Sequence, residues 1–125
     1  VFSKTNADTY NGENPFMMAN FSEYESLKEK IDFNLLLDVA HLKVSAKTLS
    51  LDWESEFENM MSVSNYIHVS DNDGFHDLNN QLTKTSSLLT MLEQSNTKNK
   101  DFTLEVYDGM SAIKKSHEAL LRVVS

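Results

Sequence analysis

The sequence contains no cysteine, which excludes disulfide bonds and thiolate metal ligands. One proline and three glycines among 125 residues argue against low-complexity disorder. No apolar run approaches the roughly 20 residues that a membrane-spanning helix needs. Residues 1–20 also lack the apolar core of a secretory signal. We therefore expect a cytoplasmic protein that makes no use of a membrane.

The charge is one-sided, with a net value of −8. Affinity for nucleic acid comes largely from lysine and arginine side chains that neutralise phosphates, so nucleic acid is a disfavoured partner for so acidic a chain. The hydrophobic fraction of 40% is sufficient for a buried core, and the length fits one domain.

Three apolar stretches predict buried strands, at residues 34–39, 65–70 and 102–107. They lack the alternation of apolar and polar residues that a half-exposed strand shows, so we expect both faces of the sheet to be covered. Helical patterns lie around them, at residues 23–31, from Asp52 onward, at about 85–95 and at 110–124. The order α-β-α-β-α-β-α indicates a parallel sheet covered by helices.

The remaining segments carry weaker patterns. Residues 1–20 predict a long loop, and residues 41–51 indicate no more than a short helical turn. Ser22 followed by Glu25 is typical of a capping box at the start of the first helix. In the last helix the apolar spacing predicts an inward face formed by Met110, Ile113, His117, Leu120, Leu121 and Val124.

Ionisable residues accompany all three predicted strands. Asp38 and His41 follow the first strand, and Glu105 lies inside the third. The second strand contains His68 and is followed by Asp71. Because the carboxyl ends of parallel strands meet at one edge of a sheet, we expect these side chains to share one site. Neutral imidazole together with carboxylate oxygen suits Zn²⁺, Mn²⁺ or Fe²⁺.

Each of these residues also has a purely structural explanation. Asp38 is a suitable helix cap, His41 a hydrogen-bonded core or surface histidine, and Glu105 a partner for a lysine. We assign His76 to a turn and His117 to a helix face. What favours a shared site is the coincidence of such residues at equivalent points of three successive βα units.

Three motifs resemble the xylose isomerase-like TIM barrel superfamily, which includes sugar isomerases and epimerases and the endonuclease IV-type AP endonucleases (AP endonuclease family 2). The motifs are LLLDVAH at 35–41, YIHVSDNDGFHDLN at 66–79 and FTLEVY at 102–107. They resemble the metal-bearing ends of barrel strands six, seven and eight. The resemblance implies that residues 1–125 are a single partial domain, the C-terminal half of a (β/α)8 barrel with three to four parallel strands.

The resemblance also implies roles for individual residues. Asp38, His68 and Glu105 match the ligands of a divalent metal, for which Mn, Co, Zn and Mg all stay open. Glu105 also matches a carboxylate that moves a proton, and His41 matches a histidine that orients the substrate. Candidates for contact with the substrate or with the metal ligands are Asp71, Asp73 and Asp77.

The activity that the resemblance implies is that of a metal-dependent sugar or sugar-phosphate isomerase/epimerase of carbohydrate metabolism, which moves a proton next to a carbonyl. One alternative is an endonuclease IV-like metal-dependent phosphodiesterase that acts on abasic DNA. Here, however, Asn79 stands two residues after Asp77, where that group carries a histidine metal ligand. The other alternative is a non-catalytic α/β binding module.

A complete barrel needs about 250 residues and eight strands. We therefore expect the chain to associate with the missing N-terminal half or with itself, and to be inactive alone. The resemblance places a second proton-moving carboxylate on strand five, upstream of Val1, because the nearby Glu13 lies in a predicted loop.

Overall fold

The computed structural model describes residues 1–124, which form an α/β fold of six helices and three strands. In chain order the elements are α1 (Lys4–Thr9), α2 (Phe21–Lys28), β1 (Leu35–Asp38), α3 (Val39–Thr48), α4 (Trp53–Val63), β2 (Ser64–Val69), α5 (Ser87–Gln94), β3 (Asp101–Leu104) and α6 (Met110–Val124). No helix among the described residues has the length and apolar character needed to cross a membrane.

The three strands form one parallel sheet in the order β1-β2-β3, which confirms the predicted parallel arrangement. Along the sheet Asp38 pairs with His68, and His68 pairs with Thr103. The strands are shorter than predicted at their carboxyl ends. After β3 the Glu105 N–H still donates to the Val69 carbonyl at 3.0 Å, so the strand path reaches this residue.

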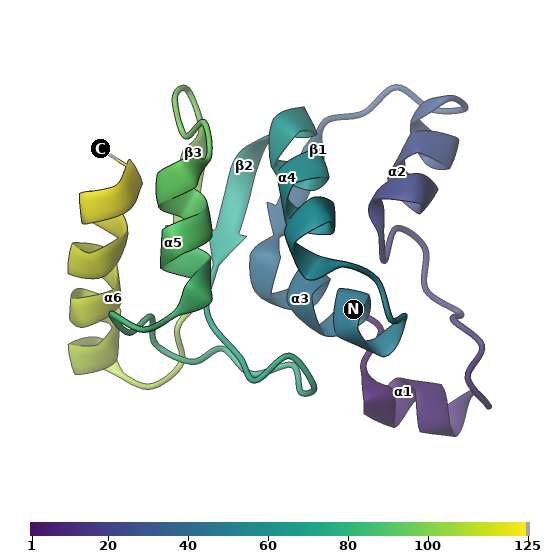
Figure 1. The fold of residues 1–125 in the computed structure, drawn as a ribbon, viewed down its shortest axis with the longest axis horizontal. Helices are drawn as coiled ribbons and strands as arrows, with labels where there is room; N and C mark the ends of the chain where they lie inside the picture. The colour runs from purple at the N-terminus through teal and green to yellow at the C-terminus, as the bar shows by residue number, and fades with distance from the viewer. Residues whose placement is uncertain (125) are drawn as a thin grey trace.

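One face of the sheet carries the core. Leu35 and Leu37 of β1 and Ile67 and Val69 of β2 are buried against residues of α3, α4, α5 and α6. In Figure 1 α4 overlies β1 and α5 overlies β3, whereas α2 lies beyond β1 and α6 lies beyond β3. The core therefore sits between a single layer of helices and a single face of the sheet.

The opposite face is open, so the expectation of two covered faces is wrong for the described residues. Leu36 is 44% exposed and Tyr66 is 42% exposed, although both lie in strands that were predicted to be buried. Alternate residues of a strand point to opposite faces, and here only one face has helices against it. The same alternation places Asp38, His68 and Glu105 on the open face.

Two helices go beyond the predicted order. Residues Val39–Thr48 form a full helix, α3, where a short turn was expected. Most of this helix is buried, including adjacent residues such as Val39 and Ala40, so its sequence lacks the one-sided apolar stripe that reveals a surface helix. The second is the six-residue helix α1, which lies within the predicted loop at residues 1–20.

Two local predictions are corrected. Helix α2 is capped by Asn20, whose side-chain oxygen accepts the Glu23 N–H at 3.0 Å, and not by Ser22. The buried face of α6 consists of Ala112, Ser116 and Leu120. Met110, His117 and Leu121, which were expected to face inward, are exposed. The small residues Ala112 and Ser116 are four apart, so they lie on one face of α6 and allow it to pack closely. This buried face is rotated around the helix axis from the face that the large apolar residues predicted.

The long connection between β2 and α5 is tied down at its start. Lys43 of α3 donates to Asp71 Oδ1 at 2.9 Å and to the Asn72 carbonyl at 2.7 Å. The other Asp71 oxygen accepts the Ser86 hydroxyl at 2.5 Å, just before α5. An antiparallel bridge between Asp71 and Asn80 closes the loop. The connection is therefore held to α3 and to α5 at the carboxyl end of the sheet.

A second lysine of α3 holds the loop tip. The Lys47 ammonium lies 4.3 Å from the centre of the Phe75 ring. Gly74 has φ +82°, and a Cβ on it would meet the Lys47 side chain at 2.7 Å. The positive φ is what favours glycine here, since the flexible end of the Lys47 side chain could move away from a Cβ.

The Asp71 network predicts a pH-dependent contribution to stability. Burial by itself raises the pKa of Asp71, but the hydrogen bonds from Ser86 and Lys43 and the Lys43 charge outweigh it, so the net pKa lies below the ordinary value. The stabilisation is complete above the unfolded pKa of about 3.9 and is lost as the pH falls through the lower folded pKa.

Asp71→Asn should cost about 1–3 kcal/mol of unfolding free energy at pH 7, because it leaves Lys43 without its carboxylate. The measurement is urea unfolding between pH 7 and pH 3. The variant should lose less stability on acidification than the wild type, whereas Asp8→Asn on exposed α1 should behave as wild type. Equal acid sensitivity of Asp71→Asn and wild type would contradict this assignment.

Candidate metal centre

Asp38 has a structural role and also lies at the candidate site. It is the last residue of β1 and the N-cap of α3, where its Oδ1 accepts the His41 N–H at 2.9 Å. The helix start directs its carboxylate beyond the carboxyl end of the sheet. The capping explanation considered from the sequence is therefore correct. It is compatible with metal binding because capping uses only Oδ1, while the second carboxylate oxygen, Oδ2, makes only a longer contact, 3.4 Å from His41 Nδ1.

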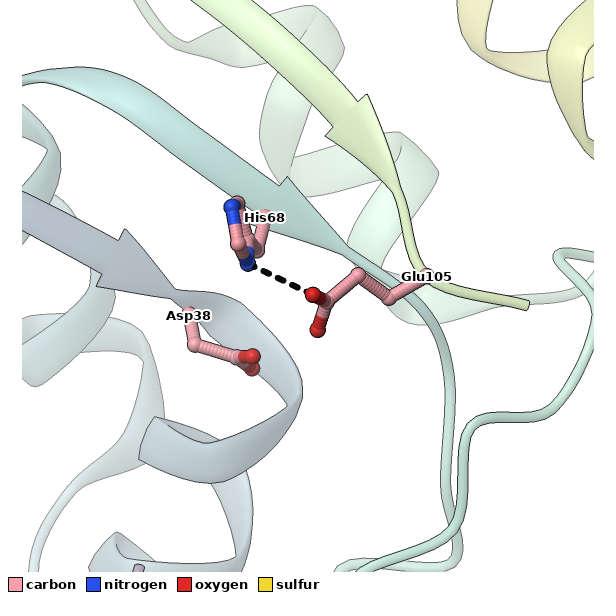
Figure 2. A group of neighbouring side chains, drawn as sticks. All are labelled: Asp38, His68 and Glu105. Carbon is pink, nitrogen blue, oxygen red and sulfur yellow. Dashed lines mark ion pairs between the residues drawn. The ribbon is translucent and has the colours of Figure 1, made fainter. Parts of the chain in front are cut away.

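His68 and Glu105 come from the neighbouring strands. The register of the sheet sets His68 beside Asp38, and Glu105 follows β3 by one residue. His68 Nδ1 lies 2.9 Å from Glu105 Oε1. The partner of the Glu105 carboxylate is therefore a histidine and not the lysine considered from the sequence. Figure 2 shows the three side chains pointing toward one another from three separate segments.

The three residues form a compact set of metal-ligating groups. One ligand atom from each of Asp38, His68 and Glu105 lies within 4.8 Å of the other two. The side chains are 13%, 19% and 28% exposed, respectively, so they are mostly shielded yet open to solvent on one side. Ligand atoms at about 2.1 Å from one ion lie roughly 3–4 Å apart, so small side-chain rotations would bring this set into range.

The donor types fit a divalent cation. One imidazole and two carboxylates supply nitrogen and oxygen ligands, which suit Zn²⁺, Mn²⁺ and related ions. Among the described residues no lysine or arginine forms an ion pair with Asp38 or Glu105, so a bound cation would balance these two carboxylates. Three ligands also leave coordination positions for a substrate.

His41 lies next to this set. Its Nδ1 is 3.4 Å from Asp38 Oδ2, and its Nε2 is 3.1 Å from Asp77 Oδ1. Both His41 and Asp77 are partly exposed at the rim of the site. The His41 ring thus contacts one carboxylate of the three-residue set and one from the loop after β2. Lys43 and Lys47 contact earlier residues of the same loop.

The other two predicted acidic residues lie elsewhere. Asp71 is occupied by Lys43 and Ser86, as described above. Asp73 is exposed and contacts the His76 ring at 2.7 Å. The hydrogen bond from His76, together with the Phe75 and His76 N–H groups, lowers the pKa of Asp73. Both residues order the loop, and neither belongs to the set formed by Asp38, His68 and Glu105.

Sequence reasoning missed one residue at the site. Tyr66 was placed in the core, but it lies on the open face two residues before His68, and the two rings are 5.2 Å apart. The period of two along a strand is the signal that could have revealed this, because it puts both side chains on one face.

Comparisons of the chain with protein-family models, with curated proteins and with solved structures find no match. The geometry of the residues is therefore what supports any function, and the family resemblance of the motifs stays a prediction.

The double use of Asp38 can be separated by two substitutions. Asp38→Asn keeps a good N-cap and should change the unfolding free energy little, whereas Asp38→Ala removes the cap and should cost about 1 kcal/mol. Both remove the carboxylate and should weaken metal binding alike. Thermal unfolding with and without Zn²⁺ measures the two effects. A zinc-induced stabilisation that survives in Asp38→Asn would contradict the ligand role.

Proposed function

We propose that Asp38, His68 and Glu105 bind a divalent metal ion, and that the chain is the metal-bearing half of a sugar or sugar-phosphate isomerase/epimerase with a xylose isomerase-like TIM barrel. The observation that carries the proposal is the convergence of three ligand atoms within 4.8 Å from the carboxyl ends of three adjacent parallel strands. This is where barrel enzymes place their catalytic groups.

The residues divide the chemistry between them. A bound divalent ion would polarise a carbonyl and its neighbouring hydroxyl and so acidify the adjacent C–H bond. The Glu105 carboxylate is partly exposed on the open face, where it reaches a substrate lying on that face and exchanges a proton with it. His41, held by Asp77, offers its ring to a substrate hydroxyl at the rim.

The open face supports the barrel part of the proposal. Among the described residues β1 and β3 each pair only with β2, so both outer edges of the sheet lack a strand partner. Unpaired edges tend to recruit further strands. Strands added at both edges would curl the sheet over Leu36 and Tyr66 and enclose the candidate site. The proposed partner is the other half of the barrel, with a second copy of the chain as the alternative.

The metal site is tested on residues 1–125 by titration with Zn²⁺ and Mn²⁺. We expect His68→Gln and Glu105→Gln each to weaken affinity at least tenfold, because each removes one of three ligands. His76→Gln is the matched control, since His76 also pairs with a carboxylate but has no second carboxylate of the set beside it. Wild-type affinity in Glu105→Gln would exclude the proposed site.

The activity is tested on the intact protein that carries this chain. With keto sugars and sugar phosphates in D₂O, the protein should place deuterium on the carbon next to the carbonyl, and a chelator should stop the exchange. Glu105→Gln should slow the exchange at least about 100-fold. His41→Asn should raise KM more than it lowers kcat. Cleavage of abasic DNA without any exchange would favour the phosphodiesterase, and metal-independent binding alone would favour a non-catalytic module.

A further inference from the structure

The Tyr66 ring supports the His68 ring. The two rings meet edge to face, with their centres 5.2 Å apart and their planes at 89°. Both side chains lie on the open face of β2. The same imidazole also contacts Glu105, with 2.9 Å between His68 Nδ1 and Glu105 Oε1. The imidazole therefore has two neighbours, an aromatic ring and a carboxylate.

The far end of Tyr66 is also held. Its hydroxyl lies 3.0 Å from Thr103 Oγ1, on the neighbouring strand β3. In the register of the sheet Thr103 is the direct neighbour of His68, so the tyrosine crosses diagonally to reach it. This contact favours the ring orientation that meets His68, although Tyr66 lies on a face that is open to solvent.

We propose that Tyr66, anchored by Thr103, is a positioning residue that holds the His68 imidazole toward the Asp38 and Glu105 carboxylates. This inference rests on the proposed metal site for its function, but the orientation of His68 can be measured without metal. Outer-shell groups of this kind change metal affinity without touching the ion, because a ligand already held in place loses less freedom on binding.

The competing explanation is that Tyr66 only fills the layer of the open face that also contains Leu36. The two explanations differ at the hydroxyl. Filling requires an apolar ring, which phenylalanine supplies equally well. Positioning also requires the contact between the Tyr66 hydroxyl and Thr103 Oγ1.

A double-mutant cycle with Tyr66→Phe and Thr103→Val tests this contact. Each substitution removes one hydroxyl and changes shape little. Each should weaken Zn²⁺ affinity severalfold, and the double variant should bind no more weakly than either single variant, because both break the same contact.

Tyr66→Leu, which also removes the ring, should weaken binding roughly 10- to 100-fold. Leu36→Ala, the control in the same layer, should bind as wild type. Additive losses in the cycle, or an equal loss in Leu36→Ala, would overturn the positioning role.

A second measurement uses the metal-free chain. NMR couplings that report χ1 of His68, together with ring contacts to Glu105, should show one rotamer in the wild type and averaging in Tyr66→Leu. Unchanged couplings in Tyr66→Leu would overturn the inference even if zinc binds. If the wild type binds no zinc while Tyr66→Leu still releases the His68 ring, the metal proposal fails and the positioning role stands.

Discussion

Parallel pairing of three short strands is the constraint on which the rest of this structure depends. It places the carboxyl ends of β1, β2 and β3 at one edge and sets Asp38 beside His68. Because side chains alternate along a strand, a slip of one residue in either register would turn a residue of the candidate metal centre toward the core. The apolar residues on the other face, such as Leu37 and Ile67, hold the register because they are buried only in this alignment.

Asp38, at the carboxyl end of β1, has two roles at once. Asp38 caps α3 and contributes to the candidate metal centre. Helix α3 in turn supplies the lysines that hold the loop after β2, and that loop brings Asp77 to His41. The position of the rim of the site therefore depends on a helix that begins at one of the proposed ligands. A change at Asp38 acts on both the cap and the site, which is why the asparagine and alanine substitutions are informative together.

The one-sided layering links the fold to the proposed function. Helices cover one face of the sheet, while the other face presents Leu36, Tyr66 and the three-residue set. In a closed barrel this second face would be the interior, where apolar side chains fill the space below a site at the carboxyl end. The proposed half-barrel would account for exposed apolar residues next to the partly buried Asp38, His68 and Glu105. The contact between Tyr66 and His68 joins this layer to the candidate metal centre.

The order and spacing of the apolar runs were sufficient to predict the α/β class and the parallel sheet. The ionisable residues near the strand ends predicted one shared site, because the carboxyl ends of parallel strands share an edge, but the choice of Asp38, His68 and Glu105 within it came from the family resemblance. The sequence did not reveal α3, because most of this helix is buried and adjacent residues such as Val39 and Ala40 are buried together, so no one-sided apolar stripe marks its period. Three features became visible only in the folded chain: one face of the sheet is open, Asp71 and Asp73 order the loop after β2, and the Glu105 carboxylate contacts the His68 ring. These outcomes depend on which surfaces pack against each other, and contacts between residues far apart in the chain leave no local pattern in the sequence.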